Sequence, residues 1–140
     1  MDSWLLWALG AAVFAALTAI LAKVGVEGIS PDVATFVRTI VVVVALGGLL
    51  AATGQASGIR TISHRSALFL TLSGLATGAS WLCYFRALQV GEASRVAPVD
   101  KLSVVLVAIL GAALLGERLS GIQWAGVACV ALGAVLVAWR

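Results

Sequence analysis

Two residues of opposite charge, Asp100 and Lys101, stand next to each other about two turns into an otherwise apolar stretch. Charged side chains in apolar surroundings are costly unless they are paired, hydrated or bound to another group, so each one needs a reason. The sequence supports two interpretations of Asp100. In the first, an ion pair with Arg38 or Lys101 gives the carboxylate a structural role. In the second, Asp100 and Lys101 contact a bound molecule or exchange a proton.

A second set of polar residues, Ser73, Thr77, Ser80 and Tyr84, recurs at intervals of four, three and four residues. This spacing is typical of one face of an α-helix, so the four side chains are expected to line a polar surface. Trp81 lies beside that face and is suited to stack on a planar or cationic molecule. The alternative is that the hydroxyl groups bond back to carbonyl groups of their own helix and serve packing alone.

Other patterns that would indicate catalysis or metal binding are missing from the sequence. Cys83 and Cys129 lie inside apolar segments without metal-ligand spacing, and His64 stands alone in a polar stretch. There is no nucleophile–base pair and no His/Asp/Glu cluster. The net charge is +3, but the basic residues are scattered rather than grouped as nucleic-acid binding requires. We therefore expect no enzymatic activity, no cofactor, no metal and no nucleic-acid partner.

The composition indicates the environment in which these residues must be positioned. Hydrophobic residues make up 62% of the chain and charged residues 11%, and the mean hydropathy is +1.13. Soluble domains contain about 45–50% apolar and about 25% charged residues. A soluble fold of 140 residues cannot hide this apolar surplus. We therefore predict a membrane protein with one domain, residues 1–140, whose surroundings are largely lipid.

Five apolar stretches are long enough to cross a bilayer, which takes roughly 20 residues of helix. Because backbone groups in hydrocarbon must be paired within the protein, and because the segments are too long for barrel strands, we predict an all-α fold of five transmembrane helices. The predicted spans are Trp4–Val24, Asp32–Thr53, Ala67–Leu88, Ser94 to the Gly116-Glu117-Arg118 corner, and Gly121–Trp139.

Local signals mark where several of these helices begin. Ser30 and Pro31 before Asp32 are a good start signal for the second helix. Ser94 is expected to cap the fourth helix and to place Pro98 in its first turn, where a missing N–H group costs little. The connection from Gly54 to Ser66 is the longest polar stretch and is predicted to be the least structured.

An odd number of spans places the two chain ends on opposite sides of the membrane. The basic residues divide unevenly between these sides, which mildly favours a cytoplasmic C-terminus but is weak enough to allow insertion in both orientations. The N-terminal side has Arg60, Arg65 and Arg118, and the other has Lys23, Arg86, Arg95, Lys101 and Arg140, with Arg38 a short way inside.

The same topology brings Lys23, Arg38, Asp100 and Lys101 toward one face of the membrane, which predicts a charged vestibule. The alternative, strongest for Lys23 and Arg86, is that long basic side chains extend to the lipid headgroups. The excess of positive charge favours an anionic or zwitterionic ligand, whereas Trp81 and Asp100 suit a cation. The sequence does not decide between them.

The run from Trp81 to Val137 contains several recognisable pieces. They are an aromatic-rich helix end with Arg86-Ala87-Leu88, an Ala-Ser pair before Pro98, a Leu-Gly-Glu-Arg-Leu corner and a Gly-rich last helix. This pattern resembles the EamA-type drug/metabolite transporters, whose repeat unit is five helices of about this length. The resemblance implies a multi-pass protein of the cell membrane that transports a small metabolite or an amphipathic organic ion. Its substrate-binding residues are then expected to be Arg38, Ser73, Thr77, Trp81, Tyr84, Asp100 and Lys101.

The chain departs from the family pattern in having one five-helix unit where familiar members have two in tandem. One unit is half of an inverted-repeat, ten-helix transporter, so a homodimer is the expected assembly, with an antiparallel arrangement preferred and a parallel one as the alternative. Gly126 and Gly133 resemble the dimer seam of the related small multidrug resistance proteins, although packing within the chain is an alternative. The first helix lacks the membrane glutamate of those proteins. The alternative function is a non-transporting scaffold or accessory subunit.

Overall fold

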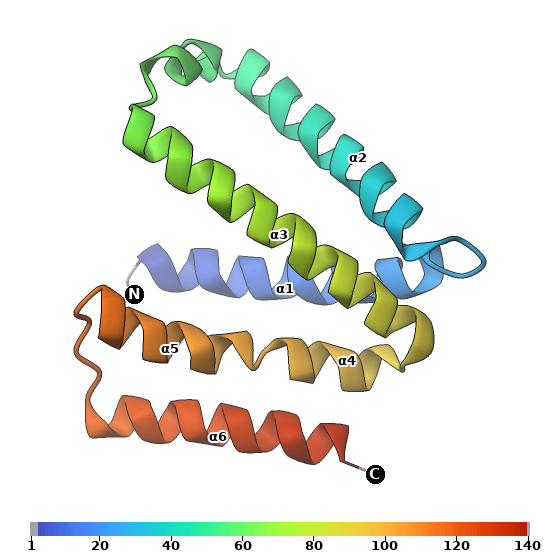
Figure 1. Cartoon of the computed structure of the whole chain (residues 1–140), viewed down its shortest axis with the longest axis vertical. Helices are drawn as coiled ribbons and strands as arrows, with labels where there is room; N and C mark the ends of the chain where they lie inside the picture. The colour runs from blue at the N-terminus through green and yellow to red at the C-terminus, as the bar shows by residue number, and fades with distance from the viewer. Residues whose placement is uncertain (1–2, 140) are drawn as a thin grey trace. The chain divides into compact units, whose positions relative to one another are not determined.

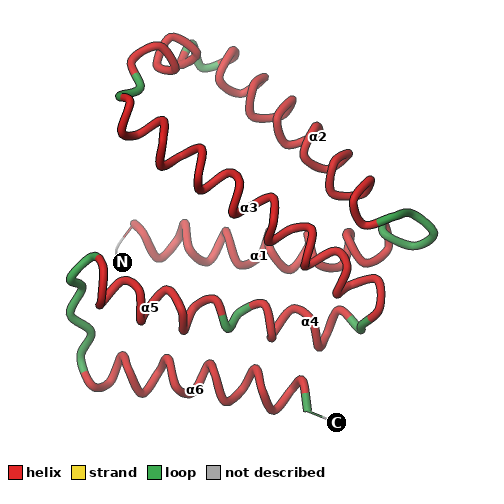
Figure 2. Tube along the Cα trace, in the orientation of Figure 1, coloured by secondary structure: helices red, strands yellow, loops and turns green. Residues whose placement is uncertain are grey.

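The computed structural model describes residues 3–139, and every regular element in this range is helical (Figures 1 and 2). The elements in chain order are α1 (Ser3–Gly25), α2 (Pro31–Ala52), the 3₁₀ helix η1 (Gln55–Thr61), α3 (His64–Val90), α4 (Ala93–Asp100), α5 (Ser103–Leu114) and α6 (Gly121–Ala138). Arg140, which entered the predicted charge asymmetry, lies outside the described residues.

Within residues 3–139, five helical stretches are long and apolar enough to cross a membrane: Trp4–Gly25, Pro31–Ala52, His64–Val90, Ala93–Leu114 and Gly121–Ala138. Large apolar side chains cover these helices and point outward, as Leu110 and Leu136 do. In water such a surface would be unstable, whereas in lipid it is the expected exterior. The predicted all-α fold with five transmembrane helices is confirmed.

The chain divides into two compact units, one formed by Met1–Ile20 with Val90–Arg140 and the other by Leu21–Gln89. In the first unit, α6 packs against both α4 and α5. In the second, η1 packs against the end of α2 and connects it to α3, which runs back in the opposite direction (Figure 1). The organisation of residues 1–140 as a single domain stays a prediction.

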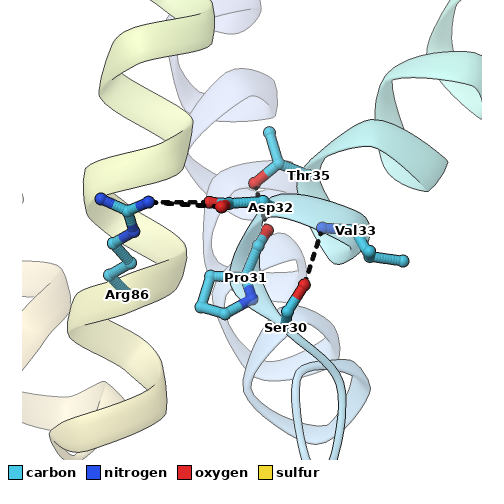
Figure 3. Close-up of polar contacts among 6 residues, drawn as sticks. All are labelled: Ser30, Pro31, Asp32, Val33, Thr35 and Arg86. Atoms are coloured by element: carbon cyan, nitrogen blue, oxygen red, sulfur yellow. Dashed lines mark hydrogen bonds and ion pairs between the residues drawn. The ribbon is translucent and has the colours of Figure 1, made fainter.

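The start of α2 follows the predicted signal (Figure 3). Ser30 is the N-cap, its hydroxyl oxygen accepts a hydrogen bond of 3.3 Å from the Val33 N–H group, and Pro31 is the first helical residue. Asp32 lies in the first turn, where a negative charge is favourable. The polar connection that follows α2 is more ordered than predicted, because Gln55–Thr61 forms η1 and α3 already begins at His64.

The prediction for the fourth span was wrong in two respects. Its N-cap is Glu92 rather than Ser94, so Pro98 lies in the second turn and not in the first. There its ring and missing N–H group oppose the α-helical bond to the carbonyl four residues back. The helix ends two residues later, and hydrogen bonds spanning three residues, Lys101 N–H to Pro98 O (3.1 Å) and Leu102 N–H to Val99 O (3.0 Å), close the turn before α5.

The last helix begins with a complete capping box. The Ser120 hydroxyl accepts from the Gln123 N–H group at 3.3 Å, and the Gln123 side chain accepts from the Ser120 N–H group at 2.7 Å. This end follows a corner in which Gly116 adopts φ +70°, a conformation that a residue with a Cβ adopts only with strain. The interpretation of Gly116-Glu117-Arg118 as a turn is therefore consistent with the structure.

We expect Ser120→Ala to destabilise the protein by about 1 kcal/mol, because it leaves an N-terminal N–H group of α6 without its partner. Ser94→Ala is the matched control and is expected to have no measurable effect, since Ser94 is exposed and is not the N-cap of α4. Titration with sodium dodecyl sulfate in mixed micelles, followed by circular dichroism, measures both. Equal destabilisation by the two substitutions would contradict this assignment.

Candidate functional site

A stack of one cation on two aromatic rings bridges α2 and α3. The Arg38 guanidinium carbon lies 4.1 Å from the centroid of the Trp81 ring and 5.6 Å from that of Phe85. Both distances are within the range of cation–π attraction. Trp81 and Phe85 are four residues apart and therefore lie on the same face of α3. Phe85 is only 3% exposed, so this part of the platform is fixed by packing.

Polar contacts next to the stack hold the start of α2 to the end of α3. The Arg86 guanidinium donates to both carboxylate oxygens of Asp32, at 3.0 and 3.3 Å (Figure 3). The Gln89 side chain donates to the Ile29 carbonyl oxygen at 3.2 Å. These contacts fix the two helices at one end, and Arg38 lies almost two turns further along α2, deeper in the span.

Lys23 and Arg86 each make a contact within the protein, and their predicted extension toward the headgroups stays a prediction. The Lys23 ammonium group donates at 2.6 Å to the carbonyl oxygen of Leu88, which is in the last turn of α3. The last four carbonyl groups of a helix have no partner within it, and a cation is favourable there. Arg86 pairs with Asp32, and both side chains remain well exposed (65% and 60%). Lys23 therefore joins the end of α1 to the end of α3, and Arg86 joins the start of α2 to the same end of α3.

The predicted polar face of α3 lies next to the Arg38 stack. At about 100° per residue, Thr77 and Tyr84 are within about 60° of Trp81 around the helix. Tyr84 is near enough to interact electrostatically with Arg38. The Thr77 hydroxyl donates to the Ser73 carbonyl oxygen at 2.9 Å, so the alternative of back-bonding holds for this residue. Ser73 and Ser80 are exposed.

Asp100 and Lys101 form an ion pair at the break between α4 and α5. The Lys101 ammonium lies 3.2 Å from an Asp100 carboxylate oxygen, with side chains 54% and 36% exposed respectively. Of the two partners considered for Asp100, Lys101 is therefore the one that pairs with it in the structure. Arg38 belongs to the other compact unit, so the vestibule predicted from both sets of residues stays a prediction.

Three contacting residues were missed by the sequence analysis. Phe85 was hidden among other apolar residues, although its spacing from Trp81 was a usable signal. Asp32 was interpreted as a helix-start residue alone. Arg95 donates at 2.6 Å to the carbonyl oxygen of Ala138 and so completes the end of α6. No local signal identifies that contact, because it depends on the packing of α4 against α6.

The helix α6 presents two adjacent faces. Its less exposed residues repeat at helical spacing, as expected of the side packed in the unit, and they are Val127, Ala131, Ala134 and Ala138. Gly126 and Gly133 lie on the neighbouring face and are exposed, and a Cβ atom added at either would meet no atom within 4 Å. Close packing within the compact unit of α6 therefore does not account for these two glycines, and packing within the chain stays an alternative.

The fold and these contacts define a multi-pass integral membrane protein with charged and aromatic groups inside its spans. Within the described residues, no three His, Cys, Asp or Glu side chains gather where they could bind a metal ion.

Comparison with known proteins agrees with this class. The EamA-like transporter family matches residues 2–139. A Sinorhizobium protein described as "Uncharacterized transporter in cobO 3'region" is 57% identical over 137 residues, which cover 98% of this chain and 97% of the relative. No solved structure matches the chain significantly. The chain therefore belongs to the EamA-like transporter family, and it is a membrane transporter whose architecture is consistent with the plasma membrane.

If the polar face of α3 borders an aqueous path, cysteines introduced at Ser73, Thr77 and Ser80 are expected to react with a small water-soluble thiol reagent. Cysteines at Leu72, Leu75 and Ala79, about 120–180° from Trp81 around the helix, are expected to stay unlabelled in lipid because the reagent cannot reach them. Cys83 and Cys129 are free and exposed thiols, so both are replaced before the new cysteines are introduced. Equal labelling of the two sets in proteoliposomes would show that α3 has no aqueous face.

Proposed function

We propose that this chain moves a small metabolite or an amphipathic organic ion across the membrane, as a secondary transporter or facilitator, and that it works as a homodimer. The observation that supports this function best is the Asp100–Lys101 ion pair at the break inside the fourth span. The residues proposed to contact the solute are this pair in one compact unit and, in the other, Arg38, Trp81 and Tyr84. Ser73 and Thr77 are proposed to contact it along α3.

An interrupted helix with charges at the interruption is unfavourable in lipid unless it borders protein or water. The interruption itself is tolerated in lipid, because 3₁₀-type hydrogen bonds of Lys101 and Leu102 satisfy the backbone, so the charges, rather than the break, are the unfavourable feature. Ionisable residues there usually mark solute or proton paths, and many transporters bind their substrates where helices are discontinuous. A scaffold or accessory subunit that transports nothing needs no charged pair at this depth, so transport explains Asp100 and Lys101 better.

Asp100→Asn is expected to abolish transport while leaving the protein folded, because the carboxylate is lost but the side-chain volume stays the same. The pair is one-third to one-half exposed, so we expect a stability loss of about 1 kcal/mol or less. Solute uptake into proteoliposomes and unfolding of the same sample measure the two effects.

Asp32→Asn is the matched control for this substitution. It breaks the other carboxylate ion pair, which lies at the start of α2 and is 60–65% exposed. We expect near-normal transport from this variant. Full transport by Asp100→Asn would remove Asp100 from the site and favour the structural interpretation.

Two observations support the homodimer. One five-helix unit contains half the helices that tandem relatives use to enclose a path, and the Sinorhizobium relative is matched over 97% of its length by this single unit. The exposed face of α6 with Gly126, Val130 and Gly133 offers a second copy a surface on which two helices can approach closely. Small residues at such surfaces favour helix association in lipid.

Gly126→Leu combined with Gly133→Leu is expected to weaken the dimer, because each leucine holds the partner helix away from this surface. Gly47→Leu is the control, since Gly47 also has open space around it but belongs to α2. Crosslinking and light scattering in native-lipid particles measure the assembly. A monomeric wild-type protein would rule out the dimer, and an unchanged dimer in the double variant would rule out this seam.

The two copies are proposed to be antiparallel, because only then do the paths of the two units open to opposite sides, as alternating access requires. The weak asymmetry of basic residues permits both orientations. C-terminal fusions to one reporter active only in the cytoplasm and another active only outside are expected to give comparable signals. Strong signal from a single reporter would contradict the antiparallel arrangement.

A further inference from the structure

We infer that the solute is an organic oxyanion, a carboxylate or a phosphate ester, that binds the edge of the Arg38 guanidinium where this group stacks on Trp81 and Phe85. This inference rests on the proposed transport function and names the chemical class of its substrate. The sequence left that class open, since Trp81 and Asp100 favoured a cation whereas the basic residues favoured an anion.

Both features that favoured a cationic solute already have a partner in the protein. The Trp81 ring has the Arg38 guanidinium 4.1 Å from its centroid, so the stacking cation is a residue of the chain itself. The Asp100 carboxylate has the Lys101 ammonium at 3.2 Å. Neither Trp81 nor Asp100 therefore requires a cationic solute as its partner.

Arg38, in contrast, has no carboxylate partner within its own compact unit, residues 21–89. The carboxylate ion pair of that unit is Asp32–Arg86, and Asp100 of the other unit is paired with Lys101. A guanidinium carries five N–H donors. Within residues 21–89 the Arg38 side chain has these two ring contacts and no hydrogen bond, so the donors that recognise oxyanions remain available beside the aromatic rings.

The chemistry of these donors defines the ligand. A guanidinium edge offers two parallel N–H groups, which match the two oxygens of a carboxylate or of a phosphate group. Arg38 is half-buried and lies inside the second span, where an unpaired charge is unfavourable. An oxyanion that enters the site supplies the missing counter-charge, so the two opposite charges compensate each other inside the span.

The test uses the fluorescence of Trp81 in protein whose other tryptophans, Trp4, Trp7, Trp124 and Trp139, are replaced by Phe. The protein is kept in a maltoside detergent, which contains no phosphate group that could imitate the solute. Iodide is the anionic probe, caesium is the cationic probe, and potassium chloride keeps the ionic strength constant. We expect iodide to quench Trp81 saturably and more efficiently than caesium.

Four competitors are then added: acetate, benzoate, inorganic phosphate and glycerol phosphate. Protection of Trp81 from iodide by the first two indicates a carboxylate site, and protection by the last two indicates a phosphate site. Arg38→Gln is expected to weaken iodide binding at least about tenfold, the effect of losing one charge-assisted hydrogen bond. Arg38→Lys keeps the charge but loses the planar fork, so an intermediate loss is expected. Arg86→Gln is the matched control and leaves quenching unchanged, because Arg86 pairs with Asp32.

Several outcomes would overturn the inference. They are equal quenching by iodide and caesium, unchanged iodide binding in Arg38→Gln, and failure of all four oxyanions to protect wild-type Trp81. The wild-type competition requires no substitution at Arg38, so a folding defect in the variants does not weaken the test. Anion binding without uptake of any solute would overturn the proposed transport function and leave the anion site in place. Uptake that depends on Asp100, together with equal quenching of Trp81 by iodide and caesium, would overturn the anion site and leave the proposed transport function in place.

Discussion

Polar groups inside a bilayer must find their partners within the protein, because hydrocarbon offers none. This constraint explains why every regular element in residues 3–139 is a helix, and it also explains many of the side-chain contacts. Thr35, Thr39 and Thr77 each donate to the carbonyl group four residues earlier in the same helix. Helix ends, whose carbonyl groups have no partner in the helix, receive donors from other segments, as the Lys23–Leu88 and Arg95–Ala138 contacts show.

The same constraint separates the charged residues into two groups. Asp32 and Arg86 are paired near the ends of their helices, where they join α2 to α3 and remain exposed. Arg38 lies deeper in its span and is stabilised by aromatic rings. Asp100 and Lys101 occur where Pro98 interrupts the fourth span and where the helix geometry changes. Charges at these inner positions are unfavourable for folding. We therefore propose that they are present for transport rather than for stability.

Span number and type were predictable because hydrophobic length is a local property of the chain. The start of α2 was predictable for a similar reason, since Ser30 and Pro31 act within one turn. The interruption of the fourth span was missed because Ser94 was assumed to be the N-cap. A shift of the helix start to Ala93 with Glu92 as its cap moves Pro98 from a harmless position to a disruptive one. Helix starts vary by a few residues with little change in energy, so the sequence alone does not resolve such a shift.

For the candidate site, the sequence by itself determined which residues are unusual. Arg38, Asp100 and Lys101 stand out because charge is rare in apolar runs, and Trp81 and Tyr84 stand out by their spacing with the hydroxyl residues. Only the tertiary structure decided which groups meet. Trp81 stacks on Arg38, Arg86 pairs with Asp32, and Lys23 reaches the end of α3. These contacts join residues far apart in the chain, and they depend on how α3 approaches α2 and the end of α1. The sequence does not determine that approach, because apolar side chains of similar size allow many packings.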